Sequence, residues 1–150
     1  EHASTTLAAF APADKAELLA AIGDLASAEA QHGDINTWDT SAVTDMSCLF
    51  CGSELDVESE CSGCDISKQS LNPNISAWNT SKVVNMRGMF WEAHSFTGDI
   101  SRWDVSQVTS MWDMFASARV FNQAVGSWDV SKLESIWNAF FSVNSRSQCT

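Results

Sequence analysis

The sequence predicts an α/β solenoid of about four strand–turn–short-helix rungs with a helical cap at the N-terminal end. Two observations predict it: a repeat of 25 residues marked by tryptophan, and two apolar periodicities that alternate within each repeat. A single unit of this length cannot bury its own apolar side, so successive units have to stack.

Four tryptophans mark the repeat: Trp38, Trp78, Trp103 and Trp128, which are 40, 25 and 25 residues apart. The first interval is one period with 15 additional residues. The segments around these tryptophans are 34–41, 74–81, 99–106 and 124–131. Together with the apolar block that follows each of them, they agree in residue type at about a dozen positions.

The third repeat shows both periodicities. Its first half contains Ile100, Trp103 and Val105, and the alternation at its end predicts a short strand. The second half has apolar residues at positions i, i+3, i+6 and i+7, which predicts about two helical turns; they are Val108, Met111, Met114 and Phe115. Ser106 stands at the junction, where its hydroxyl could cap the following turn.

The chain divides into three parts. Residues 1–30 are expected to form an N-terminal extension and a capping helix, which begins near Pro12 and presents Leu18 and Ile22 to the first rung. Residues 31–143 form the four-rung repeat domain, with a cysteine-rich acidic insert at 51–65. Residues 144–150 form a C-terminal tail that contains the odd cysteine, Cys149.

The repeat resembles the BspA-type repeats of microbial surface proteins, mycoplasma-type lipoproteins and algal proteins, whose pattern is approximately F-N-x-D-I-S-x-W-D-V-S-x-V-T-x-M-x-x-M-F. Residues 96–115 match it nearly throughout, and the similarity covers residues 33–141. The resemblance implies a leucine-rich-repeat-like fold with an adhesive or scaffolding role and no catalytic residues. The departures are the insert after Cys51, Ala124-Val-Gly in place of D-I-S, and Ile136 in place of Met.

Composition argues against several kinds of partner. The chain has 19 acidic and 8 basic residues, a formal charge of −11, which disfavours nucleic acid and anionic membrane surfaces. No apolar run approaches the roughly 20 residues of a transmembrane helix. The three histidines are scattered, and we find no arrangement typical of an active site. We therefore expect a non-enzymatic protein without a cofactor.

Two recurring columns of side chains have more than one interpretation. The tryptophans could form a stripe for stacking sugars or pigments, but a buried ladder is the expected filling of stacked rungs. The acidic and amide column of Asp39, Asn79, Asp104 and Asp129 could attract calcium, or it could bond its own backbone at turns. We favour the structural interpretation in both cases.

Four cysteines are clustered as two C-x-x-C pairs: Cys48 and Cys51, then Cys61 and Cys64. Two disulfides tying the insert to its rung would explain the cluster. Two zinc knuckles would explain it too, although the gap is shorter than usual, and free thiols with redox chemistry are a third interpretation. We favour disulfides, and the sequence does not select among the three pairings.

The candidate partner-binding residues are those that vary between repeats. One variable position carries Arg87, Trp112 and Trp137, and another carries Trp91 and Phe141. Indole and guanidinium groups are typical of energetically important protein contacts. The alternative is that these rings cover seams between the rungs.

The combined prediction is a protein-binding or scaffolding module outside the cytosol. One setting is an extrinsic subunit of a larger membrane complex, for example an algal photosynthetic one in the thylakoid lumen. The other is a secreted or cell-surface adhesin-like protein. A zinc-binding or thiol-redox protein using the cysteine cluster is the alternative from a different class.

Overall fold

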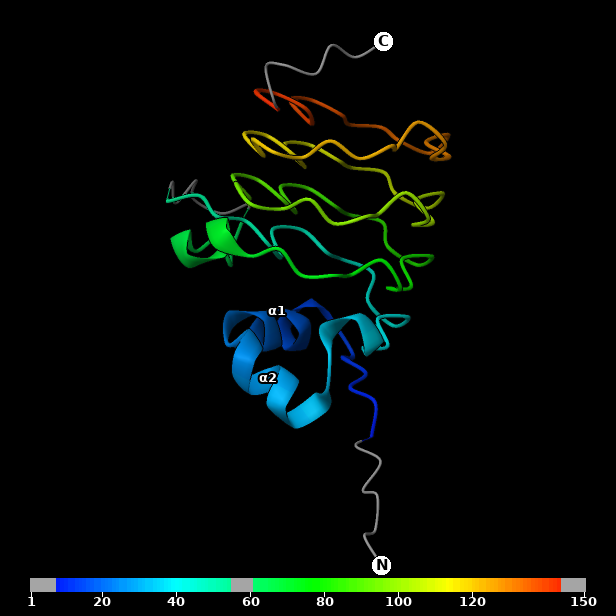
Figure 1. Ribbon diagram of the computed structural model, residues 1–150. Helices are drawn as coiled ribbons and strands as arrows, with labels where there is room; N and C mark the ends of the chain where they lie inside the picture. The colour runs from blue at the N-terminus through cyan, green and yellow to red at the C-terminus, as the bar shows by residue number, and fades with distance from the viewer. Residues whose placement is uncertain (1–7, 55–60, 144–150) are drawn as a thin grey trace, which may run out of the picture.

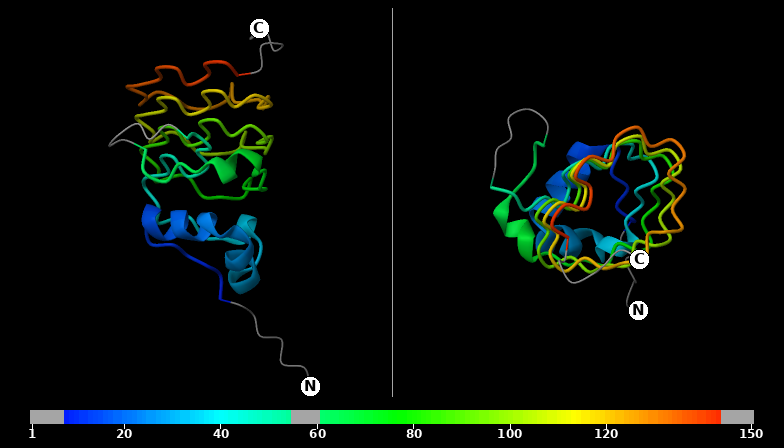
Figure 2. Two further views of the ribbon diagram at one scale, coloured as in Figure 1. Left: turned by 90° about the vertical axis from the view of Figure 1, so that its left-hand side faces the viewer. Right: turned by 90° about the horizontal axis from the view of Figure 1, so that it is seen from above.

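The computed structural model describes residues 8–54 and 61–143, which form four stacked coils above a pair of helices (Figure 1). The described residues of the coils are 34–54 with 61–73, then 74–98, 99–123 and 124–143. Viewed along the stack, the later coils superimpose closely on one another (Figure 2). The predicted tail at 144–150 with Cys149, residues 1–7, and Asp56, Glu58 and Glu60 of the insert lie outside the described residues.

Two helices lie under the first coil, where the sequence predicts one. Helix α1 is Lys15–Gly23 and α2 is Leu25–His32. Asp14 caps α1 by accepting from the amide of Glu17, and Asp24 both ends α1 and caps α2 by accepting from Ser27. Two short 3-10 turns follow, η1 at Ile35–Thr37 and η2 at Ile66–Ser70. Asp24 lies inside the apolar pattern that predicts a single helix, and because it caps a new helix there, the predicted helix is divided into α1 and α2.

Neighbouring coils are joined by hydrogen bonds from alternate residues. The amide of Met86 donates to the carbonyl of Ser110 at 2.9 Å, and that of Phe90 donates to Met114 at 2.8 Å, each to a residue 24 positions further on. Met111 donates to Ser135 in the same register. From the first coil the step is longer because of the insert: Met46 donates to Asn85.

The amides between these residues donate within their own coil. Met89 donates to the carbonyl of Met86 at 3.2 Å and Trp91 to that of Gly88 at 3.1 Å, each three residues back. The amides therefore alternate along the chain. One closes a turn within its own coil, and the next one donates to the adjacent coil. Neither a helix nor a strand ladder can continue through this alternation.

The predicted α/β solenoid of strand–turn–helix rungs is therefore wrong. The described residues contain no strand, only isolated parallel bridges linking Asp45, Asn85, Ser110 and Ser135, and their two α-helices both precede the repeats. A recurring left-handed residue prevents regular structure in the second half of each coil. It is Cys48, Gly88, Asp113 and Asn138, with φ of 61°, 56°, 54° and 56°.

Stacked aromatic rings fill the interior. Trp78 and Trp103 lie parallel with centroids 6.5 Å apart, and Phe90 stacks on Phe115 at 5.4 Å. The indole N–H of Trp78 donates to the carbonyl of Ile35, and that of Trp103 donates to Ile75. The indoles thus bury apolar area and also satisfy backbone carbonyls of the preceding coil.

The acidic and amide column bonds its own backbone. In each coil the side-chain oxygen accepts from the amide two residues later, at 3.0–3.1 Å, in Asp39, Asn79, Asp104 and Asp129. The serine hydroxyl and amide of that later residue hold the pKa of the three carboxyl groups below the usual value. These are turn-stabilising contacts, as in the backbone interpretation.

Candidate protein-contact surface

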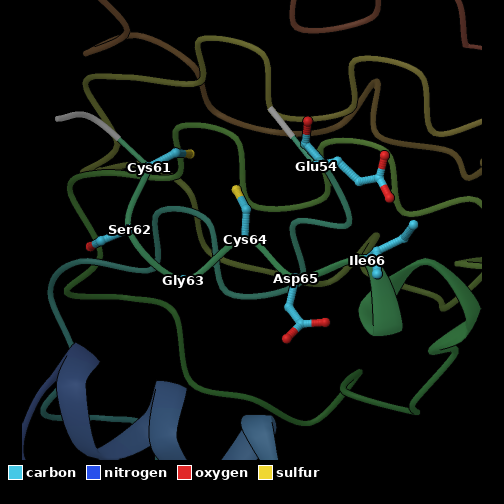
Figure 3. A pocket seen from close by; sticks show the side chains of 8 residues that line it. Glu54, Cys61, Ser62, Gly63, Cys64, Asp65 and Ile66 are labelled. Carbon is cyan, nitrogen blue, oxygen red and sulfur yellow. The ribbon is translucent and has the colours of Figure 1, made fainter. Parts of the chain in front are cut away.

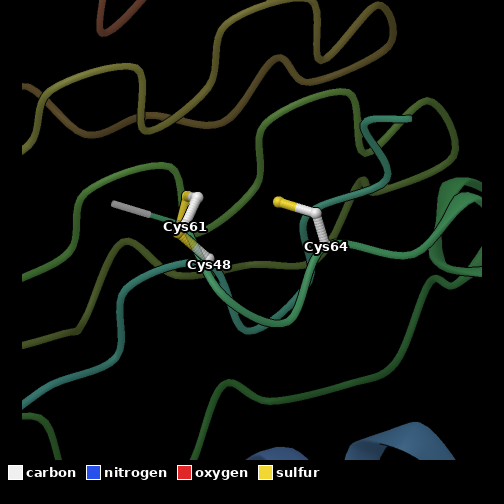
Figure 4. A group of neighbouring side chains, drawn as sticks. All are labelled: Cys48, Cys61 and Cys64. Carbon is white, nitrogen blue, oxygen red and sulfur yellow. A yellow bond between two sulfur atoms is a disulfide. The ribbon is translucent and has the colours of Figure 1, made fainter. Parts of the chain in front are cut away.

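Two disulfides join the insert to the first coil. They pair Cys48 with Cys61 and Cys51 with Cys64, with Cα–Cα distances of 5.5 and 4.6 Å. Figure 4 shows Cys61 bonded to Cys48 with Cys64 beside them; the sulfurs of these three residues lie within 4.8 Å of one another. The disulfide prediction is confirmed, and because a zinc site needs thiolates, this pairing points away from zinc.

The disulfides fix the insert against both the coil and the helical cap. The amide of Asp65 donates to the carbonyl of Cys51 at 3.0 Å, and the buried Lys68 ammonium donates to the carbonyl of Gly63. Burial lowers the pKa of Lys68. Gly63 has a φ of 111°, which favours glycine, and a β-carbon there would lie 2.6 Å from the side chain of Leu19 of α1, so the insert meets the cap closely at this residue.

An open hollow of about 550 Å³ lies beside the second disulfide (Figure 3). Its lining includes Ser53, Glu54 and residues 61–66. Within the described part of the chain, every buried side-chain nitrogen and oxygen has a hydrogen-bond partner. The hollow therefore presents no buried polar atom that waits for a ligand.

The first group of predicted partner-binding residues is aligned on successive coils. The carbonyl of Arg87 accepts from Cys48, that of Trp112 from Gly88, and that of Trp137 from Asp113, all at 2.8–3.0 Å. The Arg87 guanidinium carbon lies 4.1 Å from the centre of the Trp112 ring, in cation–π contact. Trp112 is half-buried, whereas Trp137 on the last coil is 68% exposed.

The second group lies at the neighbouring variable position. The carbonyl of Trp91 accepts from Gly52 and that of Phe141 from Ser117, both at 2.8 Å. Trp91 is half-buried and Phe141 is 63% exposed. The structure thus brings Arg87, Trp91 and Trp112 together around one hollow, while Trp137 and Phe141 lie on the last coil outside its lining.

This hollow has a volume of about 190 Å³ and a rigid floor. Its lining is Cys61, Arg87, Gly88, Trp91, Trp112 and Asp113. The Cys48–Cys61 disulfide packs so closely here that a β-carbon at residue 88 would lie 2.8 Å from the Cys61 sulfur. The covalent bridge and the bonds between coils therefore fix the backbone that carries the two indoles and the guanidinium.

Sequence reasoning missed two lining residues, Gly88 and Asp113. Burial raises the pKa of Asp113, although a hydrogen bond with Asn138 and the charge of Arg87 oppose the shift. A signal was present: Gly88, Asp113 and Asn138 occupy one repeat position, and these residue types adopt left-handed backbone most readily. Two residues at this repeat position, Gly88 and Asp113, line the hollow.

The coils and the surface together define a disulfide-stapled repeat protein with aromatic side chains aligned on one face. The chain belongs to the family described as "Mycoplasma protein of unknown function, DUF285", whose model matches residues 22–149. This agrees with the mycoplasma part of the predicted resemblance, but it does not show a BspA-type or leucine-rich-repeat protein. No curated protein and no solved structure shows significant similarity to the chain.

Two further observations concern the environment of the protein. Two disulfides indicate an oxidising, non-cytosolic compartment. Neither helix among the described residues is long and apolar enough to cross a bilayer. The family description is compatible with a surface location, and nothing here supports the thylakoid lumen that the sequence suggested as one setting.

Proposed function

We propose that this protein is a non-enzymatic binding module that contacts another protein through the face carrying Arg87, Trp91, Trp112, Trp137 and Phe141. The observation that carries the proposal is the Arg87–Trp112 pair at 4.1 Å beside a hollow held in shape by a disulfide. Large rings and guanidinium groups around a small hollow are typical of protein-contact hot spots.

Rigidity supports this choice of face. The backbone of Arg87 and Trp112 is fixed by bonds to the adjacent coils, and the floor is fixed by the Cys48–Cys61 bridge. Side chains that are already ordered lose little conformational freedom when a partner binds, which favours affinity. Exposed aromatic groups that continue along the column, at Trp137 and Phe141, extend the surface to the end of the stack.

A cell-surface or secreted adhesin-like role is the setting that we propose. An oxidising environment and a family described from mycoplasma proteins both support it. An extrinsic subunit of a membrane complex would use the same face, but no observation favours it over a surface protein.

The test is a quantitative capture of partners with the native chain and with matched variants. Arg87→Glu and Trp112→Ala remove the two halves of the stacked pair, and Arg102→Glu makes the same charge change at an exposed arginine elsewhere. We expect a partner whose affinity falls about 30-fold in each of the first two variants, as for a 2 kcal/mol hot spot. That partner should bind Arg102→Glu like the native chain.

Retention of the same partners by all three variants, at native affinity, would contradict the proposed face. Circular dichroism and thermal unfolding of each variant separate a lost contact from a lost fold. The two half-buried positions make that control necessary.

A further inference from the structure

The two disulfides are reached from solution on one side only. Cys48 and Cys51 of the first coil are fully buried. Cys61 and Cys64 of the insert are half-buried and line the open hollow shown in Figure 3. Thiol–disulfide exchange requires the attacking thiolate to reach a sulfur of the disulfide. Exchange with a thiol from solution therefore begins at the sulfurs of the insert.

Each disulfide also lies beside a sulfur that belongs to the other one. The sulfurs of Cys48, Cys61 and Cys64 all lie within 4.8 Å of one another, and Cys64 is bonded to neither of the other two. A turn at residues 62–63 folds the chain between Cys61 and Cys64, which lie side by side in Figure 4. A sulfur of the insert that is freed from its own bond is therefore already beside the next disulfide.

Backbone hydrogen bonds also hold the two cysteines of the first coil. The amide of Cys48 donates to the carbonyl of Arg87 at 2.9 Å, and the amide of Cys51 donates to the carbonyl of Cys48 at 3.3 Å. A buried free cysteine packs as a small apolar side chain. The coil can therefore keep both cysteines as thiols, whereas the two cysteines of the insert face an open hollow.

We propose that the turn from Cys61 to Cys64 is a thiol–disulfide exchange site. Reduction of either native disulfide leads there to a Cys61–Cys64 bond and leaves Cys48 and Cys51 as thiols. The substrates of the site are thiols and dithiols. This goes beyond the proposed function, because it assigns the cysteine cluster a reaction in addition to its structural role.

The exchange has two stages. In the first, a dithiol reduces Cys51–Cys64; the dithiol becomes a disulfide, and the two cysteines take up its two hydrogens. In the second, Cys64 loses its proton and its thiolate attacks the sulfur of Cys61. The Cys61–Cys64 bond forms as Cys48–Cys61 breaks, and the electron pair goes to Cys48, which takes up a proton. The second stage is an isomerisation and consumes no reductant.

Reduction of the other disulfide gives the same product. If Cys48–Cys61 is reduced first, the Cys61 thiolate attacks the sulfur of Cys64, and Cys51 leaves with the electron pair and takes up a proton. Both routes therefore end in one partly reduced form.

This rearrangement would remove both covalent links between the insert and the first coil. Cys61 lines the hollow beside the Arg87–Trp112 pair, and its sulfur lies 2.8 Å from the position of a β-carbon at residue 88. Without the bond to Cys48, no covalent link fixes this wall of the hollow, so thiols should weaken binding at the face. That consequence rests on the proposed function, whereas the exchange itself does not.

Two matched variants test the exchange without a reductant. Cys51→Ala and Cys64→Ala remove the same disulfide, but only Cys51→Ala keeps an insert thiol beside Cys48–Cys61. Both are made in the full 150-residue chain with Cys149→Ser, so that the fifth cysteine does not contribute. The proteins are incubated at about pH 8, where part of an accessible thiol is ionised. Acid then stops the exchange, and free thiols are alkylated in the unfolded chain and mapped by mass spectrometry.

We expect Cys51→Ala to contain a Cys61–Cys64 bond and a free Cys48. Alkylation of Cys48 should exceed that in Cys64→Ala by about tenfold or more, because the attacking thiolate is held beside its target. Cys64→Ala should keep Cys48–Cys61, so that loss of the neighbouring disulfide alone does not break this bond.

A second measurement uses the chain with all four clustered cysteines and one equivalent of dithiothreitol. The main partly reduced species should be alkylated at Cys48 and Cys51 and not at Cys61 or Cys64. This measurement does not depend on the folding of a cysteine variant.

The proposal is overturned if Cys51→Ala retains Cys48–Cys61, or if Cys64→Ala loses that bond equally. It is also overturned if the main partly reduced species keeps a native disulfide, or if four thiols form without a Cys61–Cys64 species. These results come from bond mapping alone, so the exchange and the proposed binding face fail independently.

Discussion

Trp103→Ala should lower the free energy of unfolding by roughly 3–5 kcal/mol, the range for removing a large buried ring. Trp103 is only 4% exposed. Its ring lies 6.5 Å from Trp78 and 6.2 Å from Phe90, and its indole N–H donates to the carbonyl of Ile75. The substitution therefore leaves a cavity between two coils and removes one of the two donors to the Ile75 carbonyl, which still accepts from the amide of Trp78. Urea denaturation followed by circular dichroism measures the change.

Trp137→Ala is the matched control. It makes the same substitution on the last coil, where the ring is 68% exposed, and should change the unfolding free energy by about 0.5 kcal/mol or less. Equal losses in the two variants would mean that the burial of Trp103 does not determine the loss, and the ring ladder would be wrong.

Removing the disulfide at the floor of the hollow is expected to have the second largest effect. The paired change Cys48→Ala and Cys61→Ala opens a covalent link between residues 13 apart and should cost about 3 kcal/mol, mainly because the unfolded chain gains freedom. Cys48 is fully buried, so lost packing adds to this loss. The measurement is thermal and urea unfolding beside the native chain.

A metal control accompanies the cysteine experiment. The native protein is reduced, and its unfolding is measured with and without added zinc. We expect reduction to lower stability in both samples to a similar degree, because the cysteines serve as disulfides. Full recovery with zinc, or native stability of the double-alanine variant, would contradict the structural role assigned to this pair.

The repeat length and the core columns could be read from the sequence because each is a local pattern of residue types. A tryptophan every 25 residues, with an apolar residue three before it, reports a buried position that recurs once per coil. Disulfides are likewise the favoured interpretation of the four cysteines, ahead of zinc and free thiols, although their pairing depends on how the chain folds back. The pairing Cys48–Cys61 and Cys51–Cys64 became evident only in three dimensions.

The secondary structure could not be predicted by the same reasoning, because turns and helices share apolar spacing. Apolar residues three apart, such as Met111 and Met114, suit a helix, but here Met114 donates to Met111 in a single turn while Met111 itself donates to the next coil. Asp113 between them has a φ of 54°, which ends any helix. Hydrogen bonds between coils therefore determine whether apolar residues three apart form a helix or separate turns, and these bonds cannot be read from the local sequence.

Only part of the candidate site could be predicted from the sequence, for a similar reason. Arg87 and Trp112 were recognised because guanidinium and indole groups stand out at a variable position of the repeat. The hollow beside them depends on Gly88 meeting the Cys61 sulfur, a contact between segments that the sequence does not place together.

From the second coil onward, each coil pairs with the next through alternate amides in a register of 24 residues, and the first coil pairs with the second in a register of 39. Scalar couplings across hydrogen bonds, measured between amide nitrogens and carbonyl carbons, test it most directly. We expect couplings from Met86 to Ser110, from Phe90 to Met114 and from Met111 to Ser135. Couplings of these amides to carbonyls four residues back in their own coil would contradict the stack and indicate helices in its place.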